Sequence, residues 1–155
     1  MSALSLPASI ELPATLETRP PQVSTAGPTH VADGSSRVLV VEDDPGVRRL
    51  IELALRRKGH VVVAVAGSRD ALAALAGQPD FTLVLTDIVM PEMNGHDLAV
   101  EIRRMVPGLP IVFMSGFAND MARQTAGELF LAKPFTVESL TTFVRQASSA
   151  PTVTP

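Results

Sequence analysis

Five short apolar runs alternate with stretches of helical periodicity, and this alternation constrains the fold more than any other feature of the chain. The runs are Arg37–Val41, Val61–Val65, Phe81–Thr86, Pro110–Met114 and Glu128–Ala132. Short runs that are apolar throughout are typical of strands buried on both faces of a parallel sheet. Because a stretch of helical pattern follows each run, the sequence predicts an α/β fold, a doubly wound parallel sheet with helices on both faces.

The predicted helices carry start and stop signals. Residues expected to cap their starts are Asp44, Ser68 and Thr136. Pro45 occupies the first helical position, where its missing N–H costs nothing, and Gly59 and Gly77 are expected to end the first two helices. His60 follows the first of these ends and is expected at the surface.

Three helices also carry apolar residues at the spacing of a buried stripe. In the first helix these residues are Val47, Leu50, Ile51, Ala54 and Leu55. In the helix predicted over Gly95–Met105 they are Leu98, Ile102 and Met105, and in the last helix they are Val137, Leu140 and Val144. We expect all of them to face the sheet.

The ordered domain is expected to span residues 37–147. Residues 1–36 carry prolines among Ser, Thr and Ala without a sustained period, which is typical of a disordered leader, and residues 148–155 are expected to form a flexible tail. Neither end is long enough for a DNA-binding domain. The start at Met1 and the loose leader favour a natural single-domain protein over a fragment of a hybrid kinase.

Charge and composition exclude several classes of protein. The formal net charge is −3 and the pI about 5.5, so nothing favours a nucleic-acid partner. The lack of cysteine excludes disulfides and a cysteine nucleophile, and fits a reducing cytosol. No apolar run approaches the ~18 residues of a membrane span. We therefore expect a cytoplasmic protein that contacts neither nucleic acid nor membrane.

Charged and polar residues stand where the predicted strands end. They are Glu42, Asp43 and Asp44 after the first run, Asp87 after the third, Ser115 after the fourth and Lys133-Pro134 after the fifth. Because the carboxyl ends of parallel strands share one edge, we expect these groups to converge. Clustered carboxylates are costly without a cation, and their oxygens suit octahedral Mg²⁺. Taken alone, the first group is better explained as a solvated acidic turn, and the metal site depends on its combination with Asp87 and Lys133.

This combination of groups suits phosphoryl transfer. A metal ion and a lysine neutralise charge on the phosphoryl oxygens, while a carboxylate acts as nucleophile and becomes an aspartyl phosphate. No general base is needed, because a carboxylate is already ionised at neutral pH.

At this point the sequence resembles a known family. The motifs Glu42-Asp43, Asp87 with Met90-Pro91 and Gly95, Ser115-Gly116 and Lys133-Pro134-Phe135 look like the CheY-like receiver domain of bacterial two-component response regulators. The resemblance covers residues 37–147 and implies a flavodoxin-like (βα)5 fold with strand order 2-1-3-4-5. The motifs are most similar to receivers of hybrid histidine kinases and to small stand-alone cell-cycle receivers of alphaproteobacteria.

The resemblance also implies residue roles. Asp87 would be the phosphoacceptor, receiving its phosphoryl group from a histidine kinase or a histidine phosphotransfer protein. Asp43 and Asp87 would ligate Mg²⁺, with Glu42 contributing directly or through water and Val89 through its backbone carbonyl. Lys133 would bind phosphate oxygens.

The same resemblance implies a switch. Ser115 would also bind phosphate and move inward on phosphorylation, coupled to inward rotation of Phe130, although Phe130 is also consistent with a plain core residue. The bond between Lys133 and Pro134 is expected to be cis, as in many receivers. The output would be a changed contact with a downstream protein partner, or phosphate relay.

Two departures from the family pattern stand out. Lys133 follows Ser115 by 18 positions, a shorter interval than usual, so the fourth helix, over about 119–125, is expected to be a turn shorter. Val89 and Phe117, which flank Asp87 and Ser115, are both apolar. We hypothesise that they hinder an attacking water and lengthen the life of an aspartyl phosphate.

Two other functions remain open. One is an aspartate-nucleophile phosphatase of the haloacid-dehalogenase type. Enzymes of this type resemble one another in having a second aspartate two residues after the nucleophile. That position holds Val89 here, which argues against enzymatic turnover. The other is a receiver-like interaction module that works without phosphorylation. The favoured function is a phosphoacceptor signalling protein rather than an enzyme.

Overall fold

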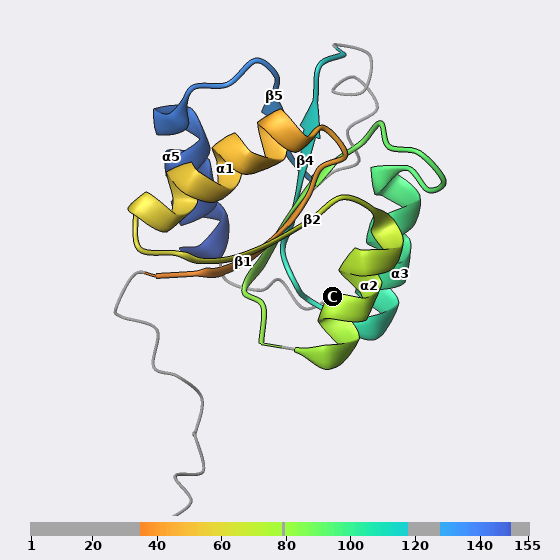
Figure 1. Ribbon diagram of the computed structural model, residues 1–155. Coiled ribbons are helices and arrows are strands. Elements are labelled where there is room, and N and C mark those ends of the chain that lie inside the picture. Colours follow the sequence, from red (N-terminus) through yellow and green to blue (C-terminus); the bar gives the residue numbers. More distant parts are fainter. Residues whose placement is uncertain (1–34, 79, 118–127, 150–155) are drawn as a thin grey trace, which may run out of the picture. The chain divides into compact units, whose positions relative to one another are not determined.

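A computed structural model describes residues 35–78, 80–117 and 128–149, and these form an α/β domain around one parallel sheet (Figure 1). The strands are β1 (Arg37–Val41), β2 (Val61–Val65), β3 (Leu83–Asp87), β4 (Ile111–Ser115) and β5 (Leu129–Ala132). The helices are α1 (Pro45–Arg57), α2 (Ser68–Gly77), α3 (Gly95–Met105) and α5 (Val137–Ser149). The predicted fourth helix lies outside the described residues.

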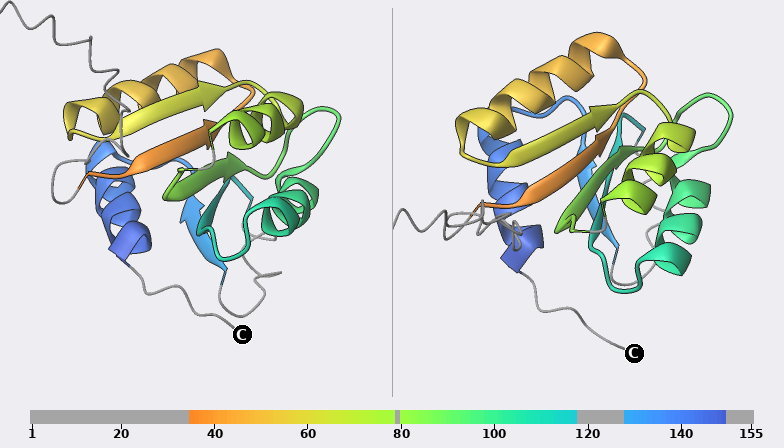
Figure 2. Two further views of the ribbon diagram at one scale, coloured as in Figure 1. Left: turned by 90° about the horizontal axis from the view of Figure 1, so that it is seen from below. Right: turned by 60° about the horizontal axis from the view of Figure 1, so that its bottom comes forward.

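The sheet order is β2-β1-β3-β4-β5 with every neighbouring pair parallel, which confirms the predicted fold class and strand order. Helices α1 and α5 cover one face, and α2 and α3 cover the other (Figures 1 and 2). Two apolar layers result: one joins α1 and α5 to the sheet through residues such as Leu55 and Val144, and the other joins α2 and α3 to it through residues such as Leu75 and Ile102. Burial of these side chains on both faces stabilises the sheet.

Three strands begin later than predicted. β3 begins at Leu83. The Thr82 amide still donates to the Arg37 carbonyl at 2.9 Å, but the Arg37 amide donates to the Thr82 side chain, at Oγ1, at 3.0 Å. β4 begins at Ile111, since Pro110 has no N–H and contributes only a carbonyl, which accepts from Val84 at 2.9 Å. β5 begins at Leu129, one residue after the predicted start.

The predicted caps of α1 and α5 are confirmed, and that of α2 is wrong. The Val47 amide donates to Asp44 Oδ1 at 2.8 Å, and the Ser139 amide donates to Thr136 Oγ1 at 3.1 Å. In α2 the Gly67 carbonyl already accepts from the Ala71 amide at 3.1 Å, so Gly67 is the cap. Ser68 is therefore the first helical residue and its side chain is buried.

Four apolar or aromatic positions differ from the predicted burial. Leu50 in α1 is 50% exposed, because the stripe there is narrower than predicted and Leu50 turns to a surface hollow beside Phe135. Met105 and Val137 are exposed because they lie at helix ends. His60, expected at the surface, is buried, and its Nδ1 accepts a hydrogen bond from the Ser36 amide at 3.1 Å.

The ends of the described domain also differ slightly from the predicted boundaries. Ser36, assigned to the leader, is buried, and its carbonyl accepts from the Val61 amide at 3.0 Å. At the other end α5 continues through Ser148 and Ser149, which were assigned to the tail, because the buried Ala147 holds the last turn to the sheet. Among the described residues, no helix has the length and apolarity needed to cross a bilayer.

Candidate functional site

The strand register brings the predicted site residues to one edge of the sheet. Val41 pairs with Thr86, Asp87 pairs with Met114, and Ser115 pairs with Ala132, so β1, β3, β4 and β5 end at nearly the same level. The residues at these strand ends must therefore lie together: Glu42 after β1, Asp87 and Ser115 at the ends of β3 and β4, and Lys133 after β5. For this reason the sequence alone could identify them.

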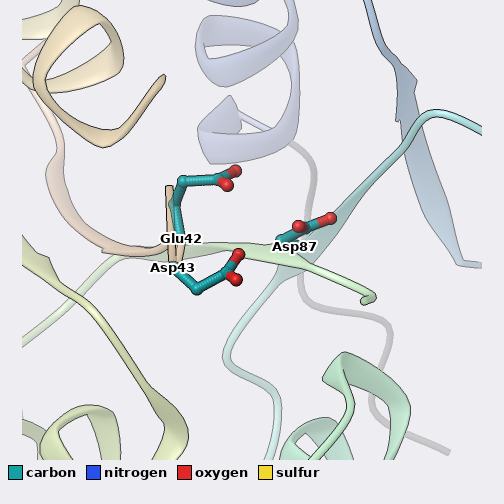
Figure 3. A group of neighbouring side chains, drawn as sticks. All are labelled: Glu42, Asp43 and Asp87. Carbon is teal, nitrogen blue, oxygen red and sulfur yellow. The ribbon is translucent and has the colours of Figure 1, made fainter. Parts of the chain in front are cut away.

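Three carboxylates form the centre of this site. Glu42, Asp43 and Asp87 each offer an oxygen atom, and these atoms all lie within 4.8 Å of one another. Figure 3 shows Glu42 and Asp43 extending from the end of β1 toward Asp87. Glu42 is 1% and Asp87 7% exposed, while Asp43 is open to solvent. This set of hard oxygen donors fits the ligand preference of Mg²⁺, with solvent access on the Asp43 side.

Lys133 joins the cluster from the loop after β5. Its Nζ lies 2.7 Å from Glu42 Oε2 and 3.2 Å from Asp87 Oδ2. One ammonium group thus serves two carboxylates that have little contact with water. The same ammonium is available to an anion that arrives at Asp87.

Burial and pairing shift the pKa values of this pair. Burial of Glu42 raises the pKa of its carboxyl above the ordinary value, since the hydrogen bond and charge of Lys133 offset burial only in part. For Lys133, burial alone would lower the pKa, but the hydrogen bond and charge of Glu42 and the charge of Asp87 outweigh it and raise the pKa. The ammonium form of Lys133 is therefore held firmly at neutral pH.

Ser115 connects this cluster to its surroundings. Its side chain is buried, and Oγ accepts a hydrogen bond from the Phe117 amide at 3.0 Å. Its carbonyl accepts from the Lys133 amide at 2.7 Å, which ties the end of β4 to the loop that carries the lysine. The peptide bond between Lys133 and Pro134 is cis.

The loop after β3 depends on one glycine. A Cβ added to Gly95 would overlap the carbonyl oxygen of Asp87, and the Gly95 amide donates to the Ile88 carbonyl at 2.9 Å. Only glycine lets α3 begin this close to the end of β3. Val89 and Phe117, each two residues beyond Asp87 and Ser115, have side chains that are 56% and 64% exposed.

Phe130 lies in an aromatic stack on the α3 side of the sheet. It packs on Phe113 with ring centroids 5.2 Å apart, and Phe113 packs on His96 at 4.7 Å. Phe130 is buried. Its packing in the core is thus established, and its role as a switch stays a prediction.

The sequence analysis missed Arg48, whose side chain binds the backbone of residues 42–44 between β1 and α1, here called the acidic loop. Its Nη1 donates to the Glu42 carbonyl at 2.7 Å and to the Asp43 carbonyl at 3.2 Å. Its position in the first turn of α1 gave no signal of this, because Arg49 beside it has the same side chain and lies on the surface.

The family model of the response regulator receiver domain matches the sequence over residues 38–145, a range that contains the three carboxylates, Ser115 and Lys133. The chain belongs to the response regulator receiver family. This receiver is 38% identical over 108 residues to the response regulator receiver protein CpdR of Brucella abortus, a match that covers 67% of this chain and 89% of CpdR.

Larger proteins contain similar receivers. The sensor kinase CckA of Brucella abortus is 38% identical over 120 residues, which cover 73% of this chain but only 12% of the kinase. The transcriptional regulator NtrC of Bradyrhizobium is 35% identical over 118 residues, and the match covers 74% of this chain and 24% of the regulator. The chain thus spans only a small part of the length of CckA and of NtrC.

Solved structures agree with this assignment. The receiver domain of the hybrid histidine kinase CckA has a TM-score of 0.64 at 29% identity, over 73% of this chain and 99% of that one. A response regulator receiver protein from Sinorhizobium medicae has a TM-score of 0.68 at 29% identity, over 75% and 96%. The predicted resemblance to both hybrid-kinase receivers and small receiver proteins is confirmed.

Proposed function

We propose that this receiver accepts a phosphoryl group on Asp87, with Mg²⁺ bound, from the phosphohistidine of a histidine kinase or a histidine phosphotransfer protein. The observation that carries the proposal is the cluster of three carboxylates and one lysine at the carboxyl edge of the sheet. Phosphorylation would alter a contact with a downstream protein or pass the phosphoryl group on.

Each residue of the cluster has a defined part in this transfer. An oxygen of Asp87 attacks phosphorus, the bond from phosphorus to the donor's imidazole nitrogen breaks, and that nitrogen keeps the electron pair. Glu42, Asp43, Asp87 and the Val89 carbonyl would hold Mg²⁺, which supplies charge neutralisation at the phosphoryl oxygens. Lys133 would turn from the carboxylates to a phosphoryl oxygen, which also accepts from Ser115.

A surface hollow beside Lys133 suits the phosphoryl donor. It measures about 420 Å³ and is lined by Val47, Leu50, Gly116, Lys133, Pro134 and Phe135. The exposed Leu50 and the aromatic Phe135 give an apolar wall next to the reacting groups, as expected for the docking of a partner helix. The partner would thereby bring its phosphohistidine to Asp87.

The proposed response to phosphorylation involves Ser115 at the end of β4 and Phe130 in the neighbouring strand β5. Ser115 would turn its hydroxyl from the Phe117 amide to the phosphoryl oxygens, and the aromatic stack of Phe130 would repack in response. This two-state change would reach the surface around β5 and α5. The proposed partners are proteins only, and a cytoplasmic location remains a prediction.

The first test is intact-mass spectrometry after incubation with acetyl phosphate and Mg²⁺. We expect a Mg²⁺-dependent gain of one phosphoryl group, about 80 Da, that Asp87→Asn abolishes. Asp44→Asn is the matched control, because it removes a neighbouring carboxylate while asparagine still caps α1. An adduct that persists in Asp87→Asn would refute the assignment of the phosphoacceptor.

The same test addresses the alternatives. No adduct with acetyl phosphate or with a phosphorylated phosphotransfer protein would favour a receiver-like module that works without phosphorylation. Catalytic release of phosphate from small phosphoesters would favour the haloacid-dehalogenase type of phosphatase, which the family match and Val89 two residues after Asp87 both oppose.

A further inference from the structure

Arg48 reaches backward from α1 to the loop that carries two of the three carboxylates. The first backbone hydrogen bond of α1 runs from the Arg48 amide to the Asp44 carbonyl at 2.9 Å, so the carbonyls of Glu42 and Asp43 lie before the helix ladder. Both carbonyls instead accept hydrogen bonds from Arg48 Nη1, at 2.7 and 3.2 Å. The guanidinium therefore substitutes for the backbone partners that a strand or helix would provide.

These two bonds fix the peptide planes on both sides of the Asp43 side chain. Asp43 itself is exposed, and no ion pair or side-chain hydrogen bond holds its carboxylate among the described residues. Glu42, by contrast, is buried and held by Lys133. The direction of the Asp43 carboxylate thus depends on the backbone that Arg48 holds.

We propose that Arg48 is a positioning residue for the Mg²⁺ site: it holds the Glu42–Asp43 backbone so that the Asp43 carboxylate faces Asp87 before the metal ion binds. The inference rests on the proposed Mg²⁺-dependent function. Groups that orient metal ligands in this way typically contribute on the order of tenfold or more to metal affinity.

A second effect of Arg48 has the opposite sign. Its positive charge lies near the carboxylates and, by simple repulsion, weakens the binding of a divalent cation. If this charge effect prevailed, removal of the guanidinium would tighten Mg²⁺ binding. If positioning prevails, as we propose, removal weakens binding even though a repelling charge has gone.

Two variants at this position separate the effects. Arg48→Met removes both the charge and the hydrogen bonds, and Arg48→Lys keeps the charge on a shorter side chain. We expect Mg²⁺ dissociation constants, measured by NMR titration at constant ionic strength, to rise on the order of tenfold in Arg48→Met and by a smaller factor in Arg48→Lys.

Arg49→Met is the matched control. Arg49 is the next residue in the same helical turn, and its guanidinium pairs with Glu52 on the surface at 3.0 Å rather than with the acidic loop. An exposed pair of this kind contributes little, so we expect an unchanged Mg²⁺ dissociation constant. Equal effects of Arg48→Met and Arg49→Met would overturn the proposal, as would tighter binding in Arg48→Met.

A measurement without metal tests the positioning directly. In metal-free protein, ¹⁵N relaxation of the Asp43 and Asp44 amides should report greater motion in Arg48→Met than in the wild type or Arg49→Met, with unchanged relaxation in β3. An equally rigid loop would refute the proposal. Wild-type protein that fails to bind Mg²⁺ would instead refute the proposed function, so the two failures are distinct.

Discussion

At the scale of single residues, the site holds more negative than positive charge, since three carboxylates cluster there with one ammonium group. Glu42 is a buried carboxylate whose nearest cation, Lys133, is shared with Asp87. Breaking a buried ion pair from one side leaves the other charge without compensation, which costs more than the pair itself contributes. Stability and chemistry are therefore coupled at Lys133.

We expect Lys133→Met to lower the free energy of unfolding by about 2–3 kcal/mol in metal-free buffer. This lies below the 3–5 kcal/mol of fully buried pairs, because Lys133 is partly exposed and Glu42 can take up a proton. Urea denaturation at pH 7 measures it. Lys58→Met, at an exposed position, is the control, and the double variant Glu42→Gln/Lys133→Met should recover most of the loss. A double variant as unstable as the single one would contradict this account.

Val89 and Phe117 lead to a kinetic prediction. Their side chains are apolar and exposed, and they follow Asp87 and Ser115 by two residues each. On the hypothesis that they flank the phosphorylated Asp87, neither offers a hydrogen bond to an attacking water. We expect Val89→Asn and Phe117→Asn each to shorten the life of the aspartyl phosphate severalfold, as followed by intact mass after removal of the donor. Val100→Asn, an exposed valine in α3, is the control. An unchanged lifetime in both site variants would count against the hypothesis.

At the scale of elements, the starts of β1 and β2 are joined by a buried histidine. His60 Nδ1 accepts from the Ser36 amide, and the Ser36 carbonyl accepts from the Val61 amide. Burial lowers the pKa of His60 below its ordinary value of about 6.5, and the imidazolium form could not accept the bond from Ser36. The neutral form thus belongs to the folded state.

This pairing predicts a pH dependence of stability. Because the unfolded chain binds a proton at His60 more readily than the folded chain, the contribution of His60 is complete above pH 6.5 and is lost as the pH falls through that value toward the lowered pKa. Urea denaturation between pH 8 and 5 should show this decline. His60→Asn keeps an acceptor without the titration and should flatten the curve; an equally steep decline in that variant would assign the titration to another group.

At the scale of the whole molecule, local patterns predicted the architecture because the strands are mostly apolar. A charged or polar residue ends β3 and β4 and directly follows β1 and β5. Parallel pairing then places Asp87, Ser115 and the acidic loop at one edge without further information. The capping roles of Asp44 and Thr136 were also predictable, since they depend only on residues within one turn.

What the sequence could not predict depends on contacts between distant elements. The buried His60 accepts a hydrogen bond from Ser36, 24 positions away. The exposure of Leu50 depends on where the loop after β5 lies. Arg48 and Arg49 differ only in the direction of their side chains, which no local pattern distinguishes. The pairing of Lys133 with both Glu42 and Asp87 likewise required the folded arrangement.

The placement of the domain's two ends has a practical consequence. β1 begins, and α5 finishes, at the amino edge of the sheet (Figures 1 and 2). Asp87 is the last residue of β3 and therefore lies at the opposite, carboxyl edge. A cargo fused at either end therefore starts on the side remote from the phosphorylation chemistry. Such a domain can be inserted between other domains, or attached to a solid support by one end, while the site around Asp87 stays accessible to a partner protein.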